Sequence, residues 1–305
     1  MFNNSARLRE AFSCFPFQCN PEKNAIEKLT NDWLQKYIVD QKMFKKFVQS
    51  RVSLISAFFF PFAPINKCVN SNKLMILLTI ADDFKEDRNQ ESEAKALIQR
   101  FMDIIENDEK VNFSPECWFE AAVSIAWQDI LNDTPIGWQR AFKSALATIM
   151  KSFIEETKFT TNVPTVEEYF ALRLISIAFN FVQLLIEYCC DKYLSYFERG
   201  NIAIQSLLTT VNYNAVVLND LFSFKKEENN ELNLIRVYMK HENLDEDEAE
   251  IKAIEFLEQN IRFYSKQRQL LCVYPDSTKW YLNYVDQIIR GTYDFYTAVP
   301  RYSLR

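Results

Sequence analysis

The sequence predicts an all-α fold in a single domain, and three observations carry that prediction. Only three glycines occur among the 305 residues: Gly137, Gly200 and Gly291. So few glycines favour helices joined by few tight turns. Residues 74–81 are almost wholly apolar and residues 204–218 are mostly apolar, and polar residues follow both stretches. The length alone favours about two domains, but the chain has no Gly/Ser/Pro-rich linker, low-complexity segment or repeat. We therefore expect one helical domain over residues 1–305, large enough to bury a sizeable core.

The predicted helices, in order, span residues 21–37, 42–60, 72–107, 115–131, 135–158, 166–181, 185–197, 201–227, 249–272 and 277–297. Residues 1–20 are expected to be irregular. Asn20-Pro21 is typical of an N-cap followed by proline at the first helical position. The second helix is expected to end at Pro61, and the break before residue 115 coincides with Pro115.

The later helices have similar punctuation. Pro164 and Thr165 precede the helix at 166, and Gly200 follows the one that ends at 197. Asp245 to Glu248 read as the first turns of a solvated helix. Most of the 26 phenylalanines and 14 tyrosines are expected to pack in the core, because aromatic side chains bury the largest areas.

Composition excludes several classes of function. The net charge of −6 and pI near 5.2 argue against a nucleic-acid partner. The single histidine, His241, makes histidine-dependent catalysis and multi-histidine zinc sites improbable. The seven cysteines are odd in number and show no C-x-x-C spacing, so neither a disulfide framework nor a zinc knuckle is indicated. Free thiols fit a reducing compartment.

The sequence also gives no indication of secretion or of a membrane-spanning segment. The N-terminal residues include charged side chains and no long apolar run, unlike a secretory signal. No stretch reaches 18 consecutive apolar residues, so we expect no stable membrane insertion. A cytoplasmic location follows as the expectation, and a homodimer is left open.

Two rows of oxygen-bearing side chains carry the functional prediction. Asn219, Ser223 and Glu227 follow each other at intervals of four, which places them on one face of a helix. Their oxygens are hard ligands of the kind Mg²⁺ takes. Such a row is also common on solvated helix faces. A second acidic row, 82–87, follows the apolar segment 74–81, and clustered carboxylates are tolerated in solvent or beside a cation.

These rows resemble the two metal motifs of class I terpene synthases of the microbial, single-domain type. The family's Asn-Asp-x-x-Ser-x-x-x-Glu motif is matched at every defined position, with Lys226 at a frequent family lysine. Its aspartate-rich motif is matched loosely, as Asp82-Asp83-x-x-Glu86 or Asp83-x-x-x-Asp87. The resemblance implies a helical bundle around a central apolar cavity.

Three further features follow the family's order over about residues 15–303. Arg173 lies 46 residues before Asn219, where the family has an arginine that senses diphosphate. The remaining motifs are matched by Asn20-Pro21 with Trp33 near the N-terminus and by Arg301-Tyr302 near the C-terminus.

Arg173 is surrounded by apolar sequence, and a lone arginine there should not be buried without an anion. The alternative is a side chain that reaches the surface and pairs with Glu167 or Glu168. In the family, the residues three and four after this arginine lie at a helix break, where a backbone carbonyl approaches the substrate. Here they are Ser176 and Ile177, whereas the family often has Asp or Thr and then Gly.

The resemblance implies three bound Mg²⁺ ions, with Mn²⁺ as an alternative. The implied ligands are Asp82, supported by Asp83, Glu86 or Asp87, and the row Asn219, Ser223 and Glu227. The implied diphosphate-binding residues are Arg173, Lys226, Arg301 and Tyr302. Aromatic side chains would line the cavity, since a desolvated cation over an aromatic face gains about 2 kcal/mol. The candidates are Phe59, Phe84, Phe179, Tyr213 and Phe295, of which Phe295 stands where many members carry Trp.

The implied reaction ionises an acyclic isoprenyl diphosphate, releases diphosphate and converts the carbocation to a terpene. Farnesyl diphosphate and a sesquiterpene product are favoured, with geranylgeranyl diphosphate and a diterpene as the alternative. A chain-elongating isoprenyl diphosphate synthase on the same fold is the closest alternative. Enzymes of that kind have two aspartate-rich motifs, and the Asn/Ser/Glu row does not fit the second of them. A helical lipid-binding or scaffold protein that has lost catalysis is the rival from another class.

Overall fold

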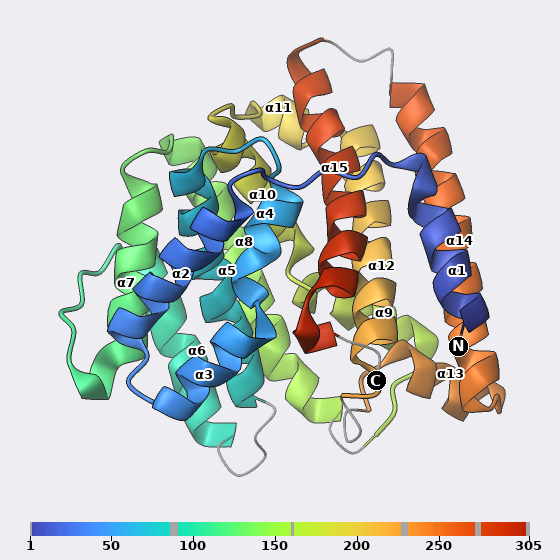
Figure 1. Ribbon diagram of the computed structural model, residues 1–305, viewed down its shortest axis with the longest axis horizontal. Helices are drawn as coiled ribbons and strands as arrows, with labels where there is room; N and C mark the ends of the chain where they lie inside the picture. Colours follow the sequence, from blue (N-terminus) through green and yellow to red (C-terminus); the bar gives the residue numbers. More distant parts are fainter. Residues whose placement is uncertain (1, 86–90, 160–161, 227–230, 272–275, 303–305) are drawn as a thin grey trace.

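The structure, a computed structural model, describes residues 2–85, 91–159, 162–226, 231–271 and 276–302, and within these ranges it contains helices and no strand (Figure 1). The all-α prediction is confirmed. The α-helices are α1 (Phe2–Ala11), α2 (Lys23–Tyr37), α3 (Gln41–Ser50), α4 (Ile55–Phe59), α5 (Ile65–Lys85), α6 (Glu91–Glu106), α7 (Trp118–Leu131), α8 (Ile136–Glu156), α9 (Val166–Ser176), α10 (Phe179–Cys190), α11 (Tyr196–Arg199), α12 (Ile202–Ser223), α13 (Leu234–Glu242), α14 (Glu246–Leu270) and α15 (Asp276–Ala298). Short 3₁₀ turns are η1 (Phe12–Cys14), η2 (Val52–Leu54), η4 (Pro115–Cys117), η5 (Thr157–Phe159) and η7 (Pro300–Tyr302).

Helix α12 is central to the bundle and packs on α9, α10, α14 and α15. Its start is fixed by Asn201, whose side chain accepts hydrogen bonds from the backbone N–H groups of Ala203 and Ile204. Beyond the first turn, most of its side chains are buried, because neighbouring helices cover it on several sides. A helix that is apolar nearly all round is what such a position requires.

Helices α4 and α15 approach each other closely at Gly291. A Cβ atom at this position would lie 2.1 Å from the carbonyl oxygen of Phe58. Only glycine permits this approach. The contact places the end of α4 against the middle of α15, one turn before Phe295.

Several predicted helices are shorter in the structure, two of them because the chain turns at non-glycine residues in the left-handed region. Arg51 has φ 53° and separates α3 from η2 and α4, so the single helix predicted over 42–60 is wrong. Ala178 has φ 60° and separates α9 from α10. The predicted helix over 201–227 is also too long, since α12 ends at Ser223.

Two further helices lie where no helix was predicted. Residues 2–11 form α1, which packs on α14 through an ion pair between Arg7 and Glu258, with Nε to Oε1 at 3.0 Å. Residues 234–242 form α13, between the helices predicted over 201–227 and 249–272. Conversely, the prediction of first helical turns at Asp245–Glu248 is confirmed: Asp245 and Glu248 form a capping box at the start of α14.

Within the described residues, one segment is long and apolar enough to cross a membrane by length and composition, Val166–Cys190. It corresponds to α9 and α10 together, which are separated at Ile177 and Ala178. Half of its most apolar window is buried inside the structure. Core helices meet the same criterion, so the segment is weak support for a membrane span.

Candidate active site

A chain of side-chain contacts joins the ends of α5, α12 and α15 to the C-terminal turn. The amide of Asn219 on α12 donates to the Tyr296 hydroxyl on α15 at 3.1 Å. The ring of Tyr296 packs edge-on against Tyr302, with centroids 4.4 Å apart. The neighbouring Arg301 then donates to Asp83 on α5 at 2.8 Å. The structure thus brings both predicted metal helices and the predicted Arg-Tyr pair into one region.

Arg173 reaches the same region from α9. Its Nη2 donates to Oδ1 of Asn219 at 2.9 Å and to Oδ1 of Asp220 at 3.2 Å. Its Nη1 donates to Oε1 of Glu156 at 3.1 Å and to the Ser176 hydroxyl at 3.3 Å. The side chain is 12% exposed. The acids that pair with it are therefore Glu156 and Asp220, not the sequence neighbours considered above.

Asp220 is buried and anchors this network rather than facing the solvent. Its Oδ2 accepts from the Tyr169 hydroxyl and from the backbone N–H of Leu234 at 2.5 Å. Burial and the nearby carboxylate raise the pKa of Tyr169 well above its usual value. Tyr169 consequently remains a protonated donor, and Asp220 is held in place beside Arg173.

The second predicted metal row is partly visible. Asn219 is half-buried, while Ser223 is 1% exposed and its Oγ has no hydrogen-bond partner among the described residues. Such an orphaned buried hydroxyl is costly unless something binds it. A divalent cation is a fitting partner for this oxygen beside the carboxamide of Asn219. Glu227, the third member of the row, lies outside the described residues.

The first predicted metal row ends α5. Asp82 and Asp83 are both half-buried, whereas Glu86 and Asp87 lie outside the described residues. No group of three or more His, Cys, Asp or Glu side chains suited to a metal occurs in the described part of the chain. The metal roles of these acids stay predictions.

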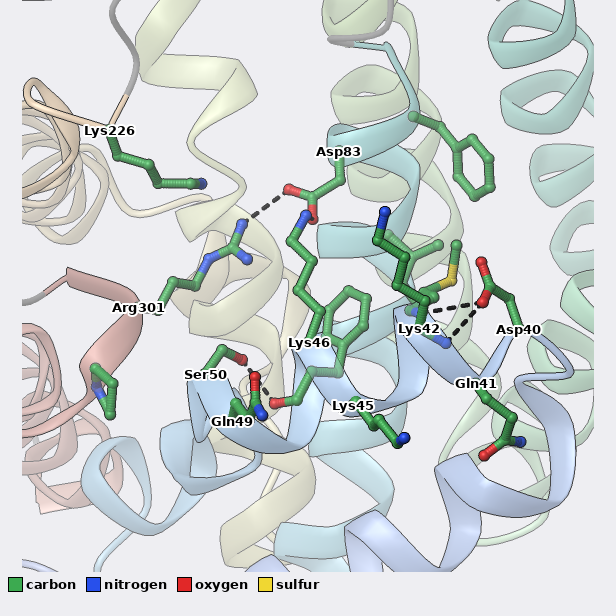
Figure 2. A pocket seen from close by; sticks show the side chains of 15 residues that line it. Asp40, Gln41, Lys42, Lys45, Lys46, Gln49, Ser50, Asp83, Lys226 and Arg301 are labelled. Carbon is green, nitrogen blue, oxygen red and sulfur yellow. Dashed lines mark hydrogen bonds and ion pairs between the residues drawn. The ribbon is translucent and has the colours of Figure 1, made fainter.

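Asp83 stands at an open cleft of about 1050 Å³ between α3, the end of α5 and η7 (Figure 2). Its Oδ1 accepts from Arg301, and its Oδ2 lies 3.1 Å from Nζ of Lys46 on α3. Burial raises the pKa of Asp83, but Arg301 and the nearby lysines outweigh it and bring the pKa below its usual 3.8. Asp83 is thus a carboxylate that holds two cations at the mouth of the site.

Three of the predicted wall residues converge from three different helices. Phe59 of α4 contacts Phe179 of α10, with ring centroids at 5.9 Å, and Phe295 of α15, with ring centroids at 6.0 Å. All three are buried. Phe295 also contacts Tyr302, with centroids at 5.8 Å, so the aromatic cluster adjoins the C-terminal turn.

The other two predicted wall residues, Phe84 and Tyr213, lie outside this aromatic cluster. Phe84 is half-buried and lines the cleft beside Asp83. Tyr213 packs on Phe170 and Phe256, with centroids at 5.0 and 5.8 Å, as part of the packing between α9, α12 and α14. The structure does not bring Tyr213 to the aromatic cluster.

The helix break expected from the family pattern is present. Ser176 ends α9, Ile177 caps it, and Ala178 turns the chain into α10 in the left-handed region. A non-glycine residue there is strained. Phe179, the first residue of α10, is thereby directed to the aromatic cluster.

Sequence reasoning missed several residues of this site. Glu156, Tyr169 and Tyr296 have no motif of their own and meet Arg173, Asp220 and Asn219 only through the packing of helices. Asp220 stood inside the recognised motif, and the apolar residues Leu221 and Phe222 after it were the one signal that it is buried. Lys46 carries no sequence signal beyond its place on a basic helix.

Comparison with known proteins fits this geometry. The family described as "Terpene synthase family 2, C-terminal metal binding" matches residues 73–262, which include Arg173, Asp82 and the whole second row. The chain belongs to this terpene synthase family. The family's description supports the binding of metal.

Individual relatives of this terpene synthase chain are distant. It is 26% identical over 226 residues to the (E)-2-epi-beta-caryophyllene synthase of Selaginella moellendorffii, covering 70% of the chain but only 59% of that relative. It is 24% identical to the 4-epi-cubebol synthase ((2E,6E)-farnesyl diphosphate cyclizing) of Streptosporangium roseum, covering 99% and 94% of the two chains.

A solved structure shares the fold. The 2-methylisoborneol synthase from Streptomyces coelicolor, in complex with Mg²⁺ and 2-fluoroneryl diphosphate, superposes with a TM-score of 0.82 at 19% identity. The match covers 95% of this chain and 96% of that one. The bundle predicted from the terpene synthase motifs is therefore confirmed as the fold.

Proposed function

We propose that the chain is a class I terpene synthase that ionises farnesyl diphosphate, releases diphosphate and converts the carbocation to a sesquiterpene. The observation that carries this proposal is the meeting of Arg173 with Asn219 at 2.9 Å, in the region that Tyr302 and Arg301 also reach. A diphosphate-sensing arginine, a metal row and a C-terminal Arg-Tyr pair have one use in common, which is to bind a leaving diphosphate. We further propose that residues 1–305 form one catalytic domain and that it acts in the cytoplasm.

The residues present fit divalent metal ions. Asp82 would hold metal at the end of α5, with Asp83, Glu86 or Asp87 in support. Asn219, Ser223 and Glu227 would hold metal at the end of α12. When bound, three Mg²⁺ ions, or Mn²⁺ in their place, supply Lewis-acid stabilisation of the departing diphosphate.

The side chains of the chain itself divide into two groups. Arg173, Lys226 and Arg301 place positive charge where the diphosphate develops negative charge, and the Tyr302 hydroxyl can donate a hydrogen bond. The aromatic cluster of Phe59, Phe179 and Phe295 excludes water and stabilises the cation electrostatically. Ser176 and Ile177 at the helix break fix the position of Arg173 relative to that cluster.

Two observations favour the fifteen-carbon substrate. The 4-epi-cubebol synthase relative, which spans nearly all of this chain, is named for cyclising farnesyl diphosphate. The caryophyllene synthase relative also carries a sesquiterpene name. Both support a C15 substrate without identifying the product here.

The test is a product assay with purified protein and Mg²⁺. Farnesyl diphosphate should yield a hydrocarbon or alcohol detected by gas chromatography, together with stoichiometric diphosphate, and excess chelator should abolish both. Geranylgeranyl diphosphate in parallel distinguishes a diterpene synthase. A longer isoprenyl diphosphate formed in the presence of isopentenyl diphosphate would contradict the proposal.

A further inference from the structure

The cleft at the mouth of the site is more basic than the chain as a whole. The described side chains that line it include five cationic ones and two carboxylates, in a protein of net charge −6. Three of the five, Lys42, Lys45 and Lys46, come from α3, an element that no predicted motif includes. A basic cleft on an acidic protein indicates an anionic ligand.

Helix α3 is held so that its basic face is presented to this cleft. At its start, the Asp40 carboxylate accepts from the backbone N–H of Lys42 at 2.7 Å. At its end, Arg51 forms a two-pronged ion pair with Glu27 at 2.8 and 2.7 Å. Between these ends, the buried side chain of Phe47 anchors the helix to the core. The lysines therefore project from a fixed helix.

Lys46 is the α3 lysine whose contacts connect it to the site. Its Nζ lies 3.1 Å from one oxygen of Asp83, while Arg301 takes the other oxygen at 2.8 Å (Figure 2). Lys226 lines the same cleft. A single carboxylate thus pairs with two cations, and its one negative charge balances only one of them.

Arg301 adds a second indication that an anion belongs here. Its side chain is only 7% exposed, and its Nε is buried with no hydrogen-bond partner among the described residues. Lys46, by contrast, is 60% exposed, so its flexible stem can follow a ligand that enters from the cleft.

We propose that Lys46 is a further diphosphate-binding residue, supplied by α3 and held beside Arg301 by Asp83. The inference rests on the proposed function, because the leaving diphosphate is the anion that the site would receive. A diphosphate carries several negative charges and can accept from both cations at once. The ammonium of Lys46 would then contact the leaving group and play no part in shaping the carbocation.

The experiment measures the binding of inorganic pyrophosphate by calorimetry in the presence of Mg²⁺. Lys46→Met should weaken binding about tenfold, the value of one lost charge-assisted hydrogen bond. Lys46→Arg should recover affinity to within about twofold of the wild type, since it retains the charge. The matched control is Lys45→Met, which removes the same charge from the same helix at a side chain that points away from Asp83 (Figure 2).

Equal losses in Lys46→Met and Lys45→Met would overturn the inference, because they would reflect only the general field of α3. So would unchanged binding in Lys46→Met. Melting temperatures of all variants verify folding. Turnover of farnesyl diphosphate by the wild type separates the two proposals: with turnover present, these outcomes remove only the role of Lys46. Wild-type protein that neither binds pyrophosphate nor releases it from an isoprenyl diphosphate would remove the proposed function and this inference together.

Discussion

At the scale of single residues, the site contains a buried hydroxyl that folding alone does not explain. Ser223 is 1% exposed and its Oγ lacks a partner among the described residues. A protein tolerates such a group when a ligand completes it. We therefore expect Ser223 to serve metal binding at some cost to stability.

Ser223→Ala tests this expectation. Since the hydroxyl makes no hydrogen bond in the structure, its removal should leave the free energy of unfolding unchanged or raise it by about 1 kcal/mol. The Mg²⁺ concentration for half-maximal turnover should rise on the order of tenfold. The control is Ser53→Ala, which loses a 2.6 Å bond to Asn31. That variant should lose about 1 kcal/mol with unchanged Mg²⁺ dependence, and the reverse pattern would contradict the assignment.

The effects of mutating Arg173 and Phe295 should differ, because we propose that Arg173 contacts the leaving group and Phe295 the cation. Arg173→Lys retains the charge but not the planar fork that joins Asn219 and Glu156. Its turnover should fall on the order of a hundredfold, and the remaining product should keep its normal distribution. Steady-state rates and gas chromatography measure the two effects.

Phe295→Ala should instead retain measurable ionisation and shift products toward early-quenched hydrocarbons and alcohols, because the enlarged pocket admits water. Removing this buried ring costs roughly 3–5 kcal/mol, so Phe295→Leu serves as the milder variant and folding is checked first. A changed product pattern in Arg173→Lys at a near-normal rate, or an unchanged pattern in Phe295→Ala, would show that the two residues are wrongly assigned.

At the scale of helices, the aromatic cluster depends on the close approach of α4 and α15. Gly291 of α15 faces the carbonyl of Phe58 of α4. Phe59, which follows Phe58 in α4, belongs to the cluster, and so does Phe295, which lies one turn after Gly291 in α15. The spacing of these two helices therefore sets the distance between two wall residues. A change in that spacing should be felt in both stability and product pattern.

Gly291→Ala should lower the free energy of unfolding by about 1–3 kcal/mol, as expected for overpacking, and should alter the product mixture. The matched control is Gly137→Ala in α8, where an added Cβ would meet nothing within 4 Å. That variant should be neutral or gain about 0.5–1 kcal/mol from reduced chain entropy. Thermal unfolding and product analysis test both. A neutral Gly291→Ala would mean that the backbone relaxes at no cost.

The helices also show what the sequence could and could not predict. Apolar periodicity and proline located α2, α7, α8 and α15 to within a few residues. Three of the misplaced ends lie at Arg51, Ala178 and Asp191, which all have positive φ although none is glycine. Tertiary packing holds these residues in the left-handed region, so local sequence carries little sign of them.

At the scale of the whole molecule, the same reasoning explains which site residues were found. Asn219 and Arg173 belong to motifs with fixed spacing, and the fold brings them into contact. Glu156 and Lys46 come from α8 and α3, outside the recognised motifs, and no family spacing relates them to those motifs. Their roles depend on the arrangement of helices, which one sequence does not specify residue by residue.

The C-terminal turn is where several helices meet. Tyr302 packs on Tyr296 and Phe295 of α15, and Arg301 pairs with Asp83 of α5. The turn also contacts α3. These contacts hold residues 300–302 at the mouth of the cleft, although chain ends are disordered by default.

Truncation after Val299 should consequently remove function more than stability. It deletes the Arg301 guanidinium and the Tyr302 ring, so turnover should fall on the order of a hundredfold. The bundle beneath retains its core, and the melting temperature should fall by no more than about 4 °C. Truncation after Tyr302 is the matched control, because it keeps both side chains and should retain wild-type turnover. If the two truncations behave alike, Arg301 and Tyr302 do not act on the substrate, and their meeting with Asp83 is a packing feature of the bundle alone.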